Sequence, residues 1–315
     1  MKMSLVLAFM FSISAQALET DQFLATKIVL KDSAPVLNDY FNKQIDDAVE
    51  EANLNSIKKC SDVAGMVMDN LVGAKYFGIS KISKFARTNP EIEKYPPMNV
   101  SDKAYFKMTF YEKADVLMKL ADLARTINLN GIYMGTDKLG HFSLIGRNYY
   151  HNYLSYKKKG QTKEEAMKNA ILKGFATERG ILGYAIGGVL SFGDLESNYE
   201  GMRFAVEVCE GDNPYVVMKN NKFVKVRDFD TKEYFNARQD ESVNFSFWRP
   251  GLYKRIQPKL QKEYCETITD PMYRERISKY PPIVENMNDK LIKEVIMTEK
   301  RFSRHLEDVK SFCNE

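Results

Sequence analysis

Apolar residues recur at helical spacing along much of the chain, and this pattern predicts a mainly helical protein. In residues 35–54, one helical face would carry Val36, Leu37, Tyr40, Phe41, Ile45 and Val49. Residues 103–127 repeat the pattern through Val116, Leu117, Leu120 and Leu123. A final long helix is expected at about 284–312. Residues 74–100, which contain three prolines, are expected to form a loop.

Residues 131–207 form a block that is rich in glycine and carries several helix-start signals. Thr136 is expected to cap a helix running from Asp137 to about residue 156. Thr162 and Glu165 have capping-box spacing, which predicts a helix over 163–178 with Met167, Ala170, Ile171 and Phe175 on its buried face. Ser191 with Asp194 would begin another helix. The glycines within 180–193 predict turns or a short hairpin between them.

Residues 215–226 alternate as a β-hairpin does, with Asn220-Asn221 at the turn. The expected fold class is therefore mainly α with a small β-hairpin region. We expect an N-terminal helical region at 18–130 and a core carrying the active site at 131–213. A hairpin and C-terminal helical region at 214–315 would pack on that core.

Residues 1–17 resemble a secretory signal peptide, with Lys2, an apolar run and the small-residue site Ala15-Gln16-Ala17. We therefore expect a periplasmic or secreted protein with no transmembrane segment in the mature chain. Four cysteines would remain, Cys60, Cys209, Cys265 and Cys313, which allow up to two disulfides in three possible pairings. Their wide spacing argues against a zinc site.

Charge and composition narrow the choice of partners. The formal net charge of +4 would become +3 without Lys2, and basic and acidic residues are interspersed. No long basic run or nucleic-acid motif occurs, so nucleic acid is not an expected partner. The apolar content of 44% is sufficient for a folded core.

Polar residues in three successive predicted helices point to one site. Asp137 and His141 are four residues apart and share a helical face, as do Asp194 and Asn198. Glu178 lies at the end of the helix between them. Gly201, near the Asn198 face, would allow a close helix approach.

The expected surroundings assign a role to each group. A helix C-terminus and the apolar neighbours Ile181, Leu182 and Tyr184 would raise the pKa of Glu178, as a general acid requires. Asp194, near a helix N-terminus, would act as stabiliser or base. His141, counted with these two as catalytic, would form a supporting pair with Asp137. Supporting or substrate-binding positions are Asp137, Lys138, Tyr184, Ser191 and Asn198.

Structural and metal-binding alternatives use the same residues. In the structural alternative, His141 would be an ordinary hydrogen-bonded histidine and Asp194 only a helix cap. Glu178 would form a solvated pair with Arg179. His141, Asp137, Glu178 and Asp194 also suit a divalent cation, but no His-x-x-x-His or Asp-x-Asp spacing supports one. Acid–base chemistry without a metal or cofactor is therefore preferred. "GHFSLIG" lacks the G-x-S-x-G elbow of serine hydrolases.

The strings "DKLGHF" and "GDLESNYEG", with Glu178 between them, resemble the D-K-x-x-H-F…E…D-x-x-x-N-x-x-G order of VanZ-like bacterial envelope proteins. A related set of predicted envelope lipoproteins has a similar order. The resemblance covers residues 131–205 and implies an envelope setting connected with cell-wall glycopeptides. The positions that it carries over are Asp137, Lys138, His141, Glu178, Asp194, Asn198 and Gly201. VanZ-like proteins span the membrane, which this chain is not expected to do.

The layout of a glutamate at a helix end followed by a turn-rich segment is also similar to lysozyme-like hydrolases. That similarity implies a lysozyme-like helical core with Tyr184, Ser191 and Asp194 lining a cleft. The resulting hypothesis is an exported hydrolase of peptidoglycan or a related glycan. The alternatives are a non-catalytic envelope binding or scaffold protein and a metal-dependent hydrolase. Tyr234, Phe247 and Trp248 would stack on sugars or, as we prefer, form part of the core.

Overall fold

The computed structural model describes residues 19–73, 79–114, 123–182, 184, 187–295, 311 and 313. Over these residues the protein is mainly helical, with three two-stranded antiparallel sheets. The predicted fold class, mainly α with small β elements, is therefore confirmed. The predicted signal peptide, residues 1–17, lies outside the described residues.

Helices dominate the N-terminal part of the described chain. Its elements are η1 (Gln22–Ala25), α2 (Ala34–Leu54), α3 (Cys60–Val72), α4 (Lys81–Thr88), α5 (Asp102–Met108) and η2 (Phe110–Lys113). Both η1 and η2 are short 3₁₀ helices.

The central part begins with a hairpin and continues with the helices that carry the site. Its elements are β1 (Thr126–Leu129), β2 (Ile132–Gly135), α7 (Asp137–Gly140), η3 (His141–Ile145), α8 (Gly146–Lys158), α9 (Lys163–Thr177), η4 (Glu178–Leu182), β3 (Val189–Leu190) and α10 (Phe192–Glu207). The segment η3 is a π-helical turn that joins α7 to α8 without a break, whereas the π turn η4 is kinked at Gly180, whose φ of −92° and ψ of −106° are not helical.

The C-terminal part contains the second hairpin and three more described helices. Its elements are β4 (Val216–Lys219), β5 (Lys222–Lys225), η5 (Thr231–Glu233), η6 (Ala237–Gln239), β6 (Phe247–Trp248), α11 (Pro250–Thr269), α12 (Pro271–Ser278) and α13 (Met287–Val295).

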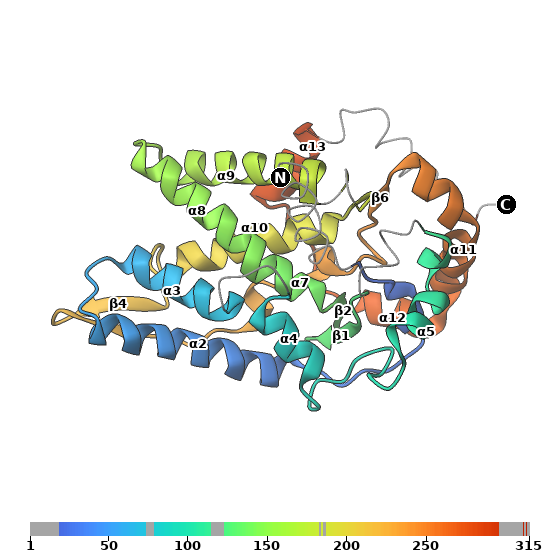
Figure 1. Ribbon diagram of the computed structural model, residues 1–315, viewed down its shortest axis with the longest axis horizontal. Coiled ribbons are helices and arrows are strands. Elements are labelled where there is room, and N and C mark those ends of the chain that lie inside the picture. The colour runs from blue at the N-terminus through green and yellow to red at the C-terminus, as the bar shows by residue number, and fades with distance from the viewer. Residues whose placement is uncertain are drawn as a thin grey trace, which may run out of the picture.

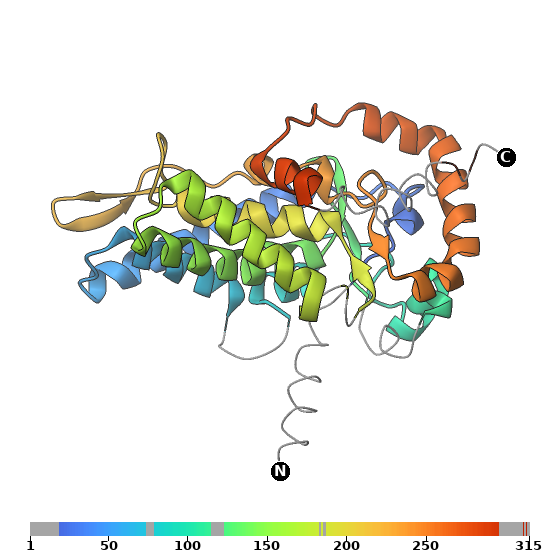
Figure 2. The ribbon, with the colours of Figure 1, turned by 90° about the horizontal axis from the view of Figure 1, so that it is seen from above.

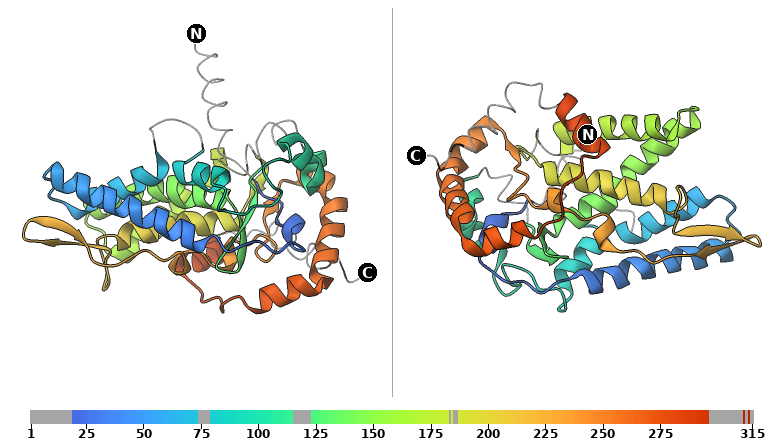
Figure 3. Two further views of the ribbon diagram at one scale, coloured as in Figure 1. Left: turned by 90° about the horizontal axis from the view of Figure 1, so that it is seen from below. Right: turned by 180° about the vertical axis from the view of Figure 1, so that it is seen from behind.

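The helices fall into two groups along the long axis of the molecule. Helices α2, α3, α8, α9 and α10 form a bundle at one end, from which the β4–β5 hairpin projects (Figures 1 and 2). Helices α5, α11 and α12 lie at the opposite end, and the views from below and behind show the same separation (Figure 3). Helix α7 and the β1–β2 hairpin lie between the two groups (Figure 1).

One apolar core contains residues from each of the three predicted regions, 18–130, 131–213 and 214–315, since its buried residues run from Ala34 to Leu291. Aromatic rings form its centre. Phe41 of α2 stacks on Phe229 with ring centroids 4.1 Å apart, and Phe142 of η3 lies 5.7 Å from Phe204 of α10. Such ring pairs stabilise a core beyond the area that they bury.

Helix α10 contacts η3 through backbone atoms. A Cβ atom at Gly201 would lie only 1.9 Å from the carbonyl oxygen of Phe142, so no other residue type fits without a shift. The expectation that Gly201 permits a close helix approach is confirmed, and this contact brings Asn198 and His141 onto facing surfaces.

Several local predictions are confirmed. The predicted apolar faces of 35–54 and 163–178 are buried or packed against the core. The Thr162–Glu165 capping box has both of its hydrogen bonds, and Ser191 accepts from the amide of Asp194 as a helix cap. Asn220 and Asn221 have positive φ values of 50° and 61° at the β4–β5 turn.

Other local predictions are wrong. Thr136 makes no capping hydrogen bond because its backbone is already helical, with φ −64° and ψ −15°. The predicted loop 74–100 contains α4, which the Ser80 side chain caps through the amide of Ser83. Within the predicted helix 103–127, helix α5 ends at Met108, and residues 126–127 belong to strand β1. These last residues are extended because the tight turn at Asn130 and Gly131, both with positive φ, pairs β1 with β2. Residues 115–122 of that prediction lie outside the described residues.

Two further predictions hold only in part. The segment 180–193 does not form a local hairpin over its described residues, since β3 pairs with β6 far along the chain. The final helix is described as α13, Met287–Val295, whereas 296–310 and 312 lie outside the described residues.

Two disulfides settle the pairing that the sequence left open. Cys60 is joined to Cys209 and Cys265 to Cys313, which is compatible with export to an oxidising compartment. In the described part of the chain, no helix is long and apolar enough to span a lipid bilayer.

Candidate functional site

Lys138 is the centre of a buried charged cluster. Its side chain is 0% exposed, and its Nζ atom lies 2.8 Å from Asp137 Oδ2, 2.6 Å from Asp194 Oδ1 and 2.8 Å from Glu241 Oε1. These three carboxylates use the three donors of an ammonium group. Lys138 therefore holds together three elements, α7, α10 and the loop before β6.

Further polar groups extend the cluster. Thr20 Oγ1 donates to Asp137 Oδ1 at 2.9 Å, and Ser191 Oγ donates to Glu241 Oε1. Ser246 Oγ lies 3.4 Å from the same Glu241 oxygen. Glu19 is also buried, 4% exposed, close enough for the charges of the cluster to act on it.

His141 connects this cluster to Glu178. Its Nε2 atom lies 3.3 Å from Asp194 Oδ2, and its Nδ1 atom lies 3.1 Å from Asn198 Oδ1 and 3.8 Å from Glu178 Oε1. Asn198 Nδ2 in turn donates to Glu178 Oε1 at 3.1 Å. The imidazole thus lies between two carboxyl groups, one from α10 and one from the end of α9.

Local helix geometry positions these side chains. The four-residue spacing of Asp194 and Asn198 places both on one face of α10, directed toward α7 and η3. Ser191 caps α10 while its hydroxyl also bonds Glu241. Glu178 follows α9 directly and begins the π turn η4. The backbone amide of Tyr184, just after η4, donates to the carbonyl oxygen of Glu178 at 3.0 Å.

Burial and mutual charge shift the proton affinities of the cluster. Burial raises the pKa of the Glu178 carboxyl, an effect that His141 opposes and Asp194 reinforces. Burial would lower the pKa of His141, but the Asp194 and Glu178 charges raise it above its ordinary value. For Glu241, burial raises the pKa to about 7 even though Lys138 acts in the opposite direction.

The pKa values of two other groups in the cluster, Glu19 and Lys138, are also raised. Burial raises the pKa of Glu19 well above its ordinary value, and the charges of Asp194 and Glu241 add to this. Burial would lower the pKa of Lys138, but Asp137, Asp194 and Glu241 more than compensate and raise it. The cluster therefore combines a lysine held in its charged form with buried carboxyls whose pKa values are raised, that of Glu241 to about 7.

The cluster has an inner and an outer part. The Lys138 and Asp137 side chains are 0% and 2% exposed, whereas those of His141, Asp194 and Glu178 are 11%, 9% and 7% exposed. The three residues predicted as catalytic thus form the more accessible side, and two predicted supporting residues lie beneath them. Glu178 is not the solvated partner of Arg179 that one alternative required, because its residue exposure is 5%.

The predicted aromatic residues belong to apolar clusters. Tyr184 packs its ring on Phe247, 5.5 Å between centroids, in an apolar cluster with Phe175, Leu190, Phe192 and Leu195. Tyr234, Phe247 and Trp248 are all buried. They are core residues, as preferred, and the alternative that they form an exposed sugar-stacking surface is wrong.

Sequence reasoning missed Glu241, Glu19, Thr20 and Ser246. Glu241 lies in the irregular segment 240–246, between η6 and β6, where no helical or strand period relates it to Lys138. Glu19 and Thr20 lie directly after the predicted signal peptide. No spacing signal in the sequence connects these residues to 137–198.

The metal alternative required His141 and at least two carboxylates to converge on a single point. Across the residues that the structure places, no group of three or more His, Cys, Asp or Glu side chains is arranged to hold a metal ion. The ammonium of Lys138 occupies the position where Asp137, Asp194 and Glu241 converge.

The chain matches no protein-family model, no curated protein and no solved structure. The resemblance of residues 131–205 to VanZ-like proteins therefore stays a hypothesis that depends on the motif residues alone.

Proposed function

We propose that this protein is an exported hydrolase of a cell-wall glycan, peptidoglycan or a modified form of it, with its acid–base site at Glu178, His141 and Asp194. The observation that carries the proposal is the convergence of all three on one cluster, from three separate helices. Lys138 and Asp137 would support them from beneath.

The proposed roles follow from the surroundings of each group. Glu178, with a raised pKa, is suited to give a proton to a leaving oxygen. Asp194, bonded by Lys138 and facing His141, would stabilise positive charge on the sugar or act as base. His141 and Asn198 would hold the two carboxyls in fixed positions.

The envelope setting has separate support. The predicted signal peptide, the two disulfides and the resemblance of 131–205 all agree with an exported protein. The glycan is the substrate class because one protonated and one charged carboxyl group is the usual division of labour in glycoside hydrolysis.

One observation favours a second candidate, a non-catalytic envelope binding or scaffold protein. Glu178 is 5% exposed and already bonded to Asn198, and Lys138 uses its three donors within the protein. A cluster that only holds α7, α9 and α10 together would have these contacts and no need for access.

Release of soluble fragments from purified peptidoglycan, normally acetylated and deacetylated, separates the two candidates. The mature protein is compared with Glu178→Gln and with Glu164→Gln, the same change at an exposed position on α9. The hydrolase proposal expects release that falls at least about 100-fold in Glu178→Gln, the scale of losing a general acid, and is unchanged in Glu164→Gln.

Thermal unfolding shows whether each variant is folded. Release that a chelator abolishes would replace this proposal with a metal-dependent one. No release from either wall by the folded mature protein would leave the scaffold candidate ahead.

A further inference from the structure

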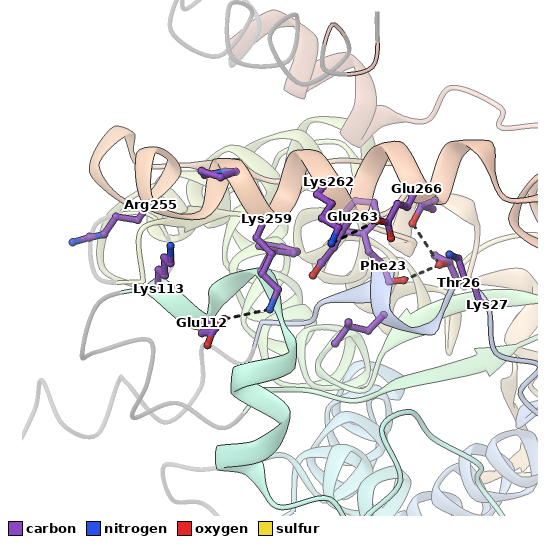
Figure 4. Close-up of a pocket in the computed structure, with 14 residues that line it drawn as sticks. Phe23, Thr26, Lys27, Glu112, Lys113, Arg255, Lys259, Lys262, Glu263 and Glu266 are labelled. Carbon is purple, nitrogen blue, oxygen red and sulfur yellow. Dashed lines mark hydrogen bonds and ion pairs between the residues drawn. The ribbon is translucent and has the colours of Figure 1, made fainter. Parts of the chain in front are cut away.

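A cavity distinct from the charged cluster lies between α11 on one side and η1 and η2 on the other (Figure 4). Its volume is about 570 Å³, within the range of small-molecule sites. Neither the proposed reaction nor the motif residues use it.

An apolar wall of Phe23, Leu24, Phe110 and Pro258 lines part of this pocket. Asp21 fixes the two phenylalanines, because its Oδ1 accepts from the amide of Phe23 at 3.2 Å and its Oδ2 from the amide of Phe110 at 2.8 Å. The two rings meet edge to face with centroids 6.1 Å apart. The wall is therefore a preformed apolar surface.

The rest of the lining is polar and contains more basic than acidic side chains. Five basic side chains, Lys27, Lys113, Arg255, Lys259 and Lys262, face three carboxyls, Glu112, Glu263 and Glu266. Glu112 pairs with Lys259 at 3.5 Å and Glu266 with Lys262 at 3.9 Å. Lys113 and Arg255 lie together at one end of the pocket, away from Glu263 and Glu266 (Figure 4).

Glu263 does not change this balance near neutral pH. Burial and the Asp21 charge raise the pKa of its carboxyl to about 9, so it is protonated at pH 7. The lining therefore sets five basic side chains against two other carboxyls, with the apolar wall beside them.

We propose that this pocket binds a small amphipathic anion, with its carboxylate or phosphate at the Lys113–Arg255 end and its apolar part on the Phe23–Phe110 wall. Basic side chains recognise either head group through charge-assisted hydrogen bonds. The inference is independent of the proposed hydrolase function.

The pocket is separate from the charged cluster but adjacent to it. Phe23 and Phe110 also line a cavity of about 10 Å³, about the size of one water, that reaches Glu241 and Ser246. The two rings therefore form the partition between the proposed binding site and the acid–base cluster.

Calorimetric titration of the mature protein with octyl phosphate and with octanoate tests the proposal. We expect saturable binding of one molecule of at least one anion, and the stronger of the two identifies the head group. Octylammonium should not bind, and 1-octanol and inorganic phosphate should each bind at least about tenfold more weakly, because each lacks one of the two contacts. Absence of binding by both anions, or equal binding of octylammonium or 1-octanol, would overturn the proposal.

Charge reversal locates the site. The double variant Lys113→Glu/Arg255→Glu should raise the Kd about tenfold or more, because both head-group contacts become repulsive. The double variant Lys219→Glu/Lys222→Glu makes the same charge change on the β4–β5 hairpin, at the opposite end of the molecule, and should leave the Kd unchanged (Figure 1).

All four substituted side chains are exposed, and thermal unfolding checks that both double variants fold. The single variant Lys113→Glu serves if the double variant does not. Unchanged affinity in a folded Lys113 variant, or an equal loss in both double variants, would contradict the assignment.

Discussion

Asp194 and Glu196 lie two residues apart on α10, and both are buried, but the protein surrounds them in different ways. Glu196 accepts hydrogen bonds from the side-chain amides of Asn236, Asn286 and Asn288, with Arg238 at 3.8 Å. Asp194 faces Lys138 and His141, and both of these side chains have other carboxyl neighbours.

The two surroundings differ in how the neighbours of a buried carboxyl change its pKa. Burial raises the pKa of Glu196 above its ordinary value, although Asn236, Arg238, Asn288 and Asn286 oppose the rise. Around Lys138 neighbouring carboxyls add to the effect of burial, as they do for Glu19 and Glu241. The amides favour the charged form of Glu196, whereas neighbouring carboxyls favour the protonated forms of Glu19 and Glu241.

The largest expected effect comes from removing the cation that holds the cluster together. Lys138→Met would leave Asp137, Asp194 and Glu241 buried without their ammonium partner, and should lower the free energy of unfolding by about 3–5 kcal/mol. Urea denaturation measures this, with the exposed Lys84→Met as control. A loss below about 1 kcal/mol would mean that the cluster does not depend on its lysine.

Stability should also depend on pH through the cluster. Glu241 binds its proton more tightly in the folded protein, with a pKa of about 7 against 4.5, so its contribution is present at low pH and is lost as pH rises through 7. The raised pKa of His141 acts in the same direction. The free energy of unfolding should therefore fall between pH 5 and pH 8.

Glutamine at position 241 stays neutral throughout that range. Glu241→Gln should flatten the decline by up to about 3 kcal/mol, following the linkage between pKa and stability. Denaturation series at four pH values compare it with Glu164→Gln. Parallel curves for all three proteins would exclude Glu241 as the titrating group.

A smaller effect is expected at the amide-bound carboxylate. Glu196→Gln replaces one acceptor oxygen by a donor that faces other amide donors, and should cost about 1–3 kcal/mol. The loss should vary less between pH 5 and pH 8 than that of Glu241→Gln, because the amides and Arg238 offset part of the effect of burial on the pKa of Glu196. A strong pH dependence would show that the two carboxylates differ less than their contacts suggest.

The smallest effect is expected from removing one amide. Asn288→Ala deletes a single hydrogen bond to Glu196, while Asn236, Asn286 and Arg238 remain, so the loss should be about 1 kcal/mol. The denaturation midpoint at neutral pH measures it. A loss as large as that of Glu196→Gln would indicate that the three amides act as one unit.

Much of the site could be predicted from the sequence because its residues lie at helical spacing. The steps from Asp137 to His141 and from Asp194 to Asn198 each cover about one turn, and Gly201 marks the close contact of α10 with η3. The Thr162–Glu165 capping box and the Asn220-Asn221 turn are equally local signals, and both are confirmed.

Features that depend on distant parts of the chain could not be predicted in this way. Glu241 reaches Lys138 from a segment without period, and β3 pairs with β6 across more than fifty residues. The β1–β2 hairpin is a different case. Its Asn130-Gly131 turn is a standard hairpin signal, but the apolar run before it was assigned to a helix.

The π turn at His141–Ile145 has a consequence for how this chain tolerates insertions and deletions. A π turn contains one residue more than an α-helical turn, and each residue of a helix rotates the next by about 100°. Deletion of one residue here would turn the π turn into an α-helical turn, which keeps α8 near its present orientation but moves the remaining residues of 141–145 relative to Asn198 and Gly201 of α10. Single-residue deletions should therefore be tolerated far less at 141–145 than in the exposed turn at 159–161, although both leave the helix count unchanged.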